Sequence, residues 1–132
     1  MIKTKVKTVS VTVETAKNEN GELYNMLFVN FTKGDKPYRL NKFLKFAETV
    51  LLNNQHGIDF FTIQTLDISK YIEDCIIVKD KNRYGEKKYL GVKFVCGYEC
   101  KIPVEDDDYF LINTMYNFND ILATATSESN KK

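Results

Sequence analysis

The stretch that decides the fold runs from residue 9 to residue 32 and reads VSVTVETAKNENGELYNMLFVNFT. Its first half alternates three valines with polar residues, which is the period of two expected for a half-buried strand. Asn20-Gly21 follows, and both residues tolerate the positive φ of a tight hairpin turn. The stretch therefore predicts a β-hairpin whose strands cover residues 3–15 and 23–32.

The second strand of this hairpin is apolar on both faces. One face carries Leu23, Leu27, Val29 and Phe31, and the other carries Tyr24, Met26 and Phe28. A strand of this kind is central in a sheet or presents its second face to a ligand. We treat Tyr24, Met26 and Phe28 as a candidate stacking platform, with burial under a helix or a partner subunit as the alternative.

The first strand continues upstream as a row of lysines, Lys3, Lys5 and Lys7, in the same alternation as the valines. The change from apolar to cationic residues indicates that the strand leaves the core or that a bulge re-aims it. The row suits contact with a phosphate backbone and equally suits protection of a sheet edge.

Downstream, apolar residues at helical spacing predict a helix that begins near Asn41 and ends at Gly57. Period-two and apolar runs predict strands over residues 60–66, 71–79 and 89–102. A C-terminal helix follows Pro103, with the acidic residues 105–108 at its start. We expect its buried stripe to hold Leu111, Met115, Phe118 and Leu122.

These elements predict a mainly β protein with helices, of the α+β class. Five short strands in two long hairpins suit a small, five-stranded β-barrel with one bridging helix and a C-terminal helix. We expect a single domain over residues 1–122 and a flexible polar tail over residues 123–132.

Composition fits a globular protein in a reducing compartment. The chain has 132 residues, of which 43% are hydrophobic and 13% aromatic. No apolar run approaches the ~18 residues that span a bilayer, and the N-terminus lacks the apolar core of a signal peptide. Three cysteines, an odd number, are typical of a reducing environment. We therefore expect a cytoplasmic protein that does not contact a membrane.

The hairpin around residues 79–93 interleaves cations with rings. It holds Lys79, Lys81, Arg83, Tyr84, Lys87, Lys88, Tyr89 and Lys93. Single-stranded nucleic acid binds to cations through its phosphates and to flat rings through its bases. The alternative is a solvated hairpin whose lysines only maintain solubility. The net charge of +1 is modest, but it divides into a basic body and an acidic segment after Pro103.

Catalytic and metal-binding signatures are missing from the sequence. Cys75, Cys96, Cys100 and His56 lack the spacing of a zinc site, and we expect Cys96 and Cys100 to be core residues on one strand face. The acidic run 105–108 lacks the pattern of a calcium loop. We predict no enzyme activity, no cofactor and no metal. A deep pocket with convergent carboxylates around Asp74, Asp80 or Glu99 would instead favour an enzyme.

The layout resembles the OB-fold, with two hairpins and a bridging helix. OB-folds place the helix between strands three and four, whereas the pattern here places it between the second and third. Three explanations of this difference stay open: the true strand order differs from the predicted one, a further short strand lies near Tyr38, or the chain is a variant of the OB-fold. More narrowly, the chain is similar to small single-stranded DNA-binding proteins of phages that infect Gram-positive bacteria. The similarity covers about residues 3–102, and the acidic tail common in such proteins is replaced by Asn-Lys-Lys.

The resemblance implies a ligand lying across strands two and three and between the hairpin loops. Together with the basic hairpin, it implies a nucleic-acid site made of Tyr24, Phe28, Lys81, Arg83, Tyr84, Lys87, Lys88, Tyr89 and Lys93.

Two functions follow as expectations. The first is largely sequence-independent binding of single-stranded DNA in phage-type replication or recombination, in the cytoplasm of a bacterial host and alongside replication or recombination proteins. The second is a protein–protein interaction module, such as a phage-encoded inhibitor or a small structural subunit. Because Tyr109, Phe110, Ile112 and Tyr116 lie outside the main stripe of the C-terminal helix, we also expect a homo-oligomer, a dimer or higher.

Overall fold

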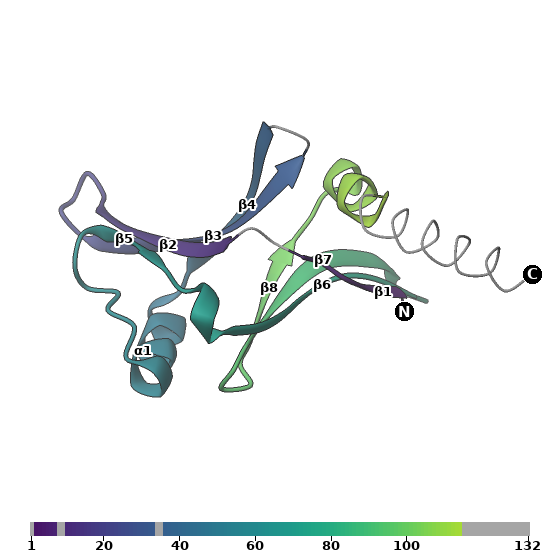
Figure 1. The fold of residues 1–132 in the computed structure, drawn as a ribbon. Coiled ribbons are helices and arrows are strands. Elements are labelled where there is room, and N and C mark those ends of the chain that lie inside the picture. The colour runs from purple at the N-terminus through teal and green to yellow at the C-terminus, as the bar shows by residue number, and fades with distance from the viewer. Residues whose placement is uncertain (1, 8–9, 34–35, 115–132) are drawn as a thin grey trace, which may run out of the picture. The chain divides into compact units, whose positions relative to one another are not determined.

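The computed structural model describes residues 2–7, 10–33 and 36–114. In this part of the chain the fold is mainly β, with the helix α1 and a second helical stretch over residues 106–114 (Figure 1). The elements in chain order are β1 (Ile2–Lys5), β2 (Ser10–Lys17), β3 (Leu23–Lys33), β4 (Lys36–Leu44), α1 (Phe46–His56), β5 (Gln64–Asp67), the 3-10 turn η1 (Ser69–Tyr71), β6 (Ile72–Asn82), β7 (Gly85–Phe94) and β8 (Glu99–Pro103).

The chain divides into two compact units. Unit 1 contains residues 1–7, 74–92 and 100–132, and unit 2 contains residues 8–73 and 93–99. The described strands pair into two four-stranded sheets, in the orders β1-β6-β7-β8 and β4-β3-β2-β5. The prediction of a closed five-stranded barrel is therefore not met by the described residues. The single domain over residues 1–122 stays a prediction, and the tail 123–132 lies outside the described residues.

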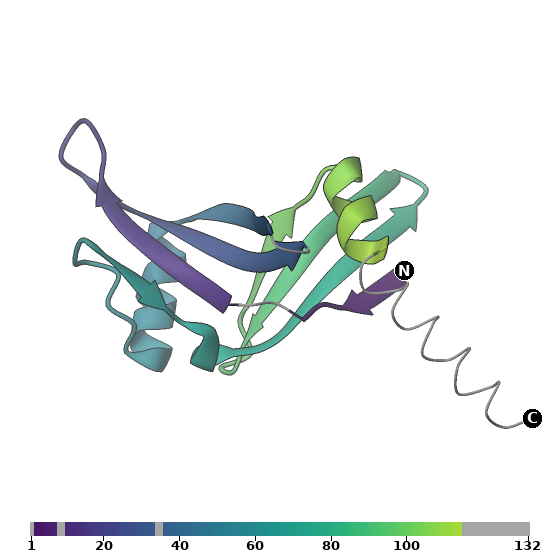
Figure 2. The same ribbon diagram turned by 45° about the horizontal axis from the view of Figure 1, so that its top comes forward.

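The sheet of unit 2 is an antiparallel arrangement built on β2 and β3. The hairpin predicted around Asn20-Gly21 is confirmed, with Val13 opposite Leu27, and Gly21 takes a φ of 79° in the turn. β4 pairs with the edge of β3 that faces away from β2, and β5 pairs with the edge of β2 that faces away from β3. In both views α1 lies beside one face of this sheet (Figures 1 and 2).

The alternation in these strands sorts side chains into a buried inner face and an outer face. Inner residues include Val11, Val13, Leu27 and Val29, each at most 1% exposed. Leu52 of α1 and Phe60, which follows that helix, are also fully buried. Burial of apolar surface stabilises by roughly 25 cal/mol per Å², so this inner layer is what holds unit 2 together.

Unit 1 consists mainly of β1, the β6–β7 hairpin and β8, with the helical residues 106–114. β1 lies at the edge of its sheet and pairs antiparallel with β6, with Thr4 opposite Ile77. Lys3, Lys5 and Lys7 are exposed, while Thr4 and Val6 are buried. The alternation thus changes phase between Lys7 and Val11, across residues that the structure does not describe. The edge position favours the edge-protection interpretation of the lysine row.

Four boundaries predicted from the sequence are wrong. The strand expected over residues 3–15 is two strands, β1 and β2, which belong to different sheets. Residues 36–44 form a strand, so the helix begins at Phe46 and not near Asn41. Residues 60–63 lie outside β5, which begins at Gln64. Residues 89–102 are two strands, because Gly97, with a φ of 97°, turns the chain between β7 and β8. Two further elements, β6 and the helical stretch after the acidic run, are confirmed with shifted ends.

Two predictions about buried side chains are also wrong. Cys96 lies in the β7–β8 turn and is exposed, while Cys100 is buried as expected. In the helical residues 106–114 the buried side chains are Tyr109 and Ile112, and Leu111 is only half-buried. The rest of the expected stripe, from Met115 onward, lies outside the described residues. None of the helices that the structure describes is long and apolar enough to cross a membrane.

Candidate nucleic-acid interface

The outer face of β3 and β4 carries aromatic and cationic side chains on an open sheet. We call Tyr24, Met26, Phe28, Arg39 and Phe43 the outer face. The register places Met26 opposite Phe43 and Phe28 opposite Asn41. Tyr24, Met26 and Phe28 are half-buried, so the described chain covers this platform only in part.

Arg39 is the central group of the outer face. Its guanidinium carbon lies 3.8 Å from the centre of the Phe28 ring, which is close cation–π geometry. Its Nε donates to Asn30 Oδ1 at 2.9 Å, and its terminal nitrogen lies 3.3 Å from Glu14 Oε1. These contacts hold the guanidinium plane over the ring, and bases stack on such planes as they do on aromatic rings.

Lys42 lies on the inner side of β4, where a buried carboxylate neutralises it. Lys42 Nζ lies 3.2 Å from Glu48 Oε2, and the Tyr98 hydroxyl donates to the same oxygen. The Lys45 backbone N–H donates to Glu48 Oε1 at 3.0 Å. Burial of Glu48 raises its pKa, but the hydrogen bonds from Tyr98, Lys45 and Lys42 outweigh this, so the pKa lies below its usual value. The network joins β4, α1 and the β7–β8 turn.

In unit 1 the tip of the β6–β7 hairpin carries a second candidate surface. We call Lys81, Arg83, Tyr84 and Lys87 the hairpin cluster. All four are exposed, and Tyr84 is 83% accessible. The Arg83 guanidinium lies 4.8 Å from the Tyr84 ring centre and donates to its hydroxyl at 2.6 Å. Within the described residues Lys81 and Lys87 have no ion pair, so their charges face solvent.

The other predicted cations are engaged with carboxylates. Lys88 pairs with Asp106 and Glu86, and these hydrogen bonds raise its pKa while lowering the pKa of both acids. Lys93 Nζ lies 3.6 Å from Glu73. Tyr89 is half-buried, with Lys101 Nζ 4.9 Å from its ring centre. A phosphate would have to compete for these groups.

The nine predicted site residues therefore fall into two groups, each described by itself. Tyr24, Phe28 and Lys93 belong to unit 2, and the remaining six belong to unit 1. Sequence reasoning missed Arg39 and Phe43 because it began a helix near Asn41, within the residues that form β4. The alternation of Pro37, Arg39, Asn41 and Phe43 with Tyr38, Leu40 and Leu44 is the signal that predicts the strand.

The cysteine, histidine and acidic side chains of the described residues are the candidates for metal binding and reactivity. No group of three His, Cys, Asp or Glu side chains is placed there to hold a metal ion. Burial raises the pKa of the Cys75 thiol to about 12, with Asp74 adding to the effect, so the thiol stays protonated at neutral pH. His56 stacks near Tyr71 and Phe94, at 4.9 and 6.1 Å between ring centres. No protein-family model, curated protein or solved structure matches this chain.

Proposed function

We propose that this protein binds single-stranded DNA, largely without sequence preference, and acts in phage-type DNA replication or recombination. The observation that carries the proposal is the guanidinium of Arg39 lying 3.8 Å over Phe28 on an open sheet face. Stacking on such a surface contributes about 1–3 kcal/mol per base and tolerates any base.

The strand order of unit 2 supports an OB-like interpretation of this face. β2, β3 and β4 follow one another in the sheet, α1 comes next along the chain, and β5 returns to pair with β2. If β2 is counted as the first strand, the helix lies between the third and fourth, as in OB-folds. β3 and β4 are then strands two and three, whose face binds oligonucleotides in that fold.

The hairpin cluster supports the same proposal from unit 1. Lys81, Arg83 and Lys87 provide exposed cations for phosphates, and Tyr84 provides an exposed ring. Phosphate contacts release counterions, so we expect affinity to fall steeply with salt.

Titration of a fluorescein-labelled dT oligonucleotide at low and high salt tests the proposal. We expect binding at low salt that weakens at high salt, and weaker binding of the duplex, whose bases cannot stack on the protein. Arg39→Lys keeps the charge but removes the plane, so it should weaken binding with little change in salt dependence. Absence of binding to the wild-type protein at low salt would refute the function.

A protein–protein interaction module is the second candidate, and Phe110 favours it. This side chain is 72% exposed on the helical residues 106–114, where Tyr109 and Ile112 face inward. Exposed aromatic side chains commonly anchor interfaces. Recovery of one specific protein from nuclease-treated extract, lost on Phe110→Ala, would support this function. The expected homo-oligomer is tested by light scattering, where a mass near 15 kDa would contradict it.

A further inference from the structure

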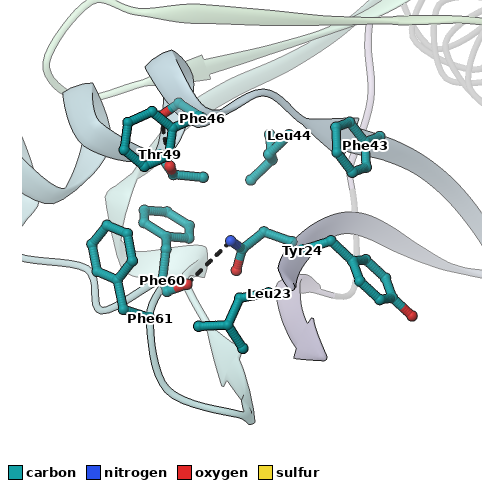
Figure 3. A pocket seen from close by; sticks show the side chains of 9 residues that line it. Leu23, Tyr24, Phe43, Leu44, Phe46, Thr49, Phe60 and Phe61 are labelled. Carbon is teal, nitrogen blue, oxygen red and sulfur yellow. Dashed lines mark hydrogen bonds between the residues drawn. The ribbon is translucent and has the colours of Figure 1, made fainter. Parts of the chain in front are cut away.

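A pocket opens at the end of the unit 2 sheet, beside the outer face. β3 begins here at Leu23, β4 ends at Leu44, and α1 begins at Phe46. The register places Asn25 opposite Leu44, so these chain ends meet at one place. Figure 3 shows side chains from β3, β4, α1 and the segment before β5 surrounding the hollow. Its volume is about 180 Å³, and it is lined by Leu23, Tyr24, Asn25, Phe43, Leu44, Phe46, Thr49, Phe60 and Phe61.

The rim of this pocket is aromatic and unusually open to solvent. Phe46 is 75% exposed, Phe43 is 55% exposed and Phe61 is 49% exposed. Exposed apolar side chains gathered in one place mark a binding surface. Phe60, by contrast, is fully buried and forms part of the pocket wall.

The size of the pocket suits one ring system. Sites for drug-sized ligands have volumes of roughly 300–1,000 Å³, and this pocket is smaller. Aromatic rims favour flat ligands because rings stack at their faces and edges. A single nucleobase meets both conditions.

The polar side chains in the pocket are already hydrogen-bonded within unit 2. Asn25 donates to the Phe60 carbonyl at 3.1 Å and accepts from Thr15. The Thr49 hydroxyl donates to the Phe46 carbonyl at 2.7 Å. These groups are committed to the protein, so the pocket is suited to stacking and poorly suited to reading base edges.

The charged residues near the pocket favour a phosphate at its edge and disfavour one beside Phe61. Lys17 pairs in register with Leu23, and Lys45 directly precedes Phe46; both are exposed and, in the described part of the chain, have no ion pair. Asp59 accepts hydrogen bonds from Thr62 and from the Phe61 backbone, which lower its pKa and keep it charged. This anion disfavours a phosphate beside Phe61, while the two lysines provide cations at the pocket's edge.

We infer that this pocket binds one base of a single strand that crosses the outer face. The base leaves the stack of its neighbours in the strand and stacks on the rings of Phe46 and Phe61. The inference rests on the proposed function and deepens it. Tyr24 and Phe43 belong to both the outer face and the pocket lining, which makes the two surfaces continuous. The pocket lies beyond the face of β3 and β4, because its rim also comes from α1 and residues 60–61.

Photocrosslinking of a dT oligonucleotide containing a single 5-iodouracil locates the base. We expect crosslinks, mapped by mass spectrometry, at Phe46 or Phe61 in addition to the outer face. Phe46→Leu keeps an apolar side chain but removes the ring, so it should weaken dT binding at least about fivefold, as the loss of one stacked base predicts. Phe46→Tyr should retain binding. Phe110→Leu makes the same substitution at a similarly exposed phenylalanine of unit 1 and is the matched control.

The outcomes separate this inference from the function on which it rests. If the wild-type protein fails to bind dT at low salt, both fail. If the wild-type protein binds but Phe46→Leu and Phe61→Leu bind equally well and crosslinks avoid both positions, the pocket inference is overturned and the function stands. A wild-type melting temperature for each variant shows that weakened binding reflects the lost ring and not unfolding.

Discussion

The hairpin cluster of unit 1 and the outer face of unit 2 differ in how they hold their charges. In the hairpin cluster, Lys81 and Lys87 face solvent without an ion pair in the described residues. On the outer face, Arg39 is held by Glu14, Asn30 and Phe28. The first surface suits diffuse contact with phosphates, and the second suits fixed stacking of a base. The difference shows that a row of cations in the sequence does not reveal which cation is held by contacts within the fold.

The largest expected effect comes from breaking the internal charge network of unit 2. Glu48→Ala removes the acceptor of Tyr98, Lys42 and the Lys45 N–H, and leaves a largely buried ammonium without its anion. We expect the free energy of unfolding to fall by about 3 kcal/mol, measured by urea denaturation. Lys87→Ala, at an exposed cation of unit 1, should change it by less than about 0.5 kcal/mol. Equal free energies of unfolding for the two variants would contradict the stabilising role of the Glu48 network.

The next effect separates a half-buried ring from an exposed one. Phe28→Ala removes a ring fixed beneath Arg39, whereas Tyr84→Ala removes one that is 83% exposed and loses side-chain entropy on binding. We expect Phe28→Ala to weaken dT binding by about 2 kcal/mol, close to 30-fold, and Tyr84→Ala to weaken it less. Fluorescence anisotropy titrations of both variants measure the difference. A larger loss for Tyr84→Ala would transfer the stacking role to unit 1.

A third variant sharpens the comparison through salt dependence. Replacing Lys81, Arg83 and Lys87 together by Ala removes three candidate phosphate contacts. The slope of log affinity against log salt should become shallower by about 2, since each contact on a single strand contributes roughly 0.7. Arg39→Lys should leave the slope nearly unchanged. An unaltered slope in the triple variant would exclude the hairpin cluster from the interface.

The smallest effect is the acid sensitivity of unit 2. The folded-state pKa of Glu48 lies below its ordinary value, so its ionisation stabilises the fold fully above the unfolded pKa. That contribution is lost as the pH falls through the folded pKa. Thermal melts between pH 7 and pH 3 should show the wild-type protein losing more stability than Glu48→Gln. Parallel pH profiles for the two proteins would show that Glu48 contributes nothing to this loss.

Local patterns predicted much of the fold. The Asn20-Gly21 turn, the alternation of the valines and the acidic start of the last helix each depend on near neighbours, and all three are confirmed. The strand β4 was predicted only as an alternative, a short strand near Tyr38, because Lys42 occupies an inward position. A charged residue at this position interrupts the alternation of apolar and polar residues that predicts a strand. The ion pair with Glu48 explains how Lys42 is accommodated on the inner side.

The candidate site was predicted less well, for a related reason. Which residues share the outer face depends on the register of β3 with β4, and the sequence pattern predicted a helix that begins near Asn41, inside β4. Phe46 and Phe61 lie 15 positions apart and meet only through tertiary folding. Exposed cations such as Lys81 were easier to predict, because a polar turn places its side chains in solvent without any long-range contact.

The position of β2 between β3 and β5 has a consequence for the order of folding. Its pairing with β3 closes across a short turn, whereas its pairing with β5 joins Thr15 to Gln64 across almost 50 residues. Closing a longer loop costs more chain entropy, and non-local contacts slow folding. We therefore expect the β2–β3–β4 meander to form first, and the amides that pair β2 with β5 to exchange with solvent faster than those that pair β2 with β3.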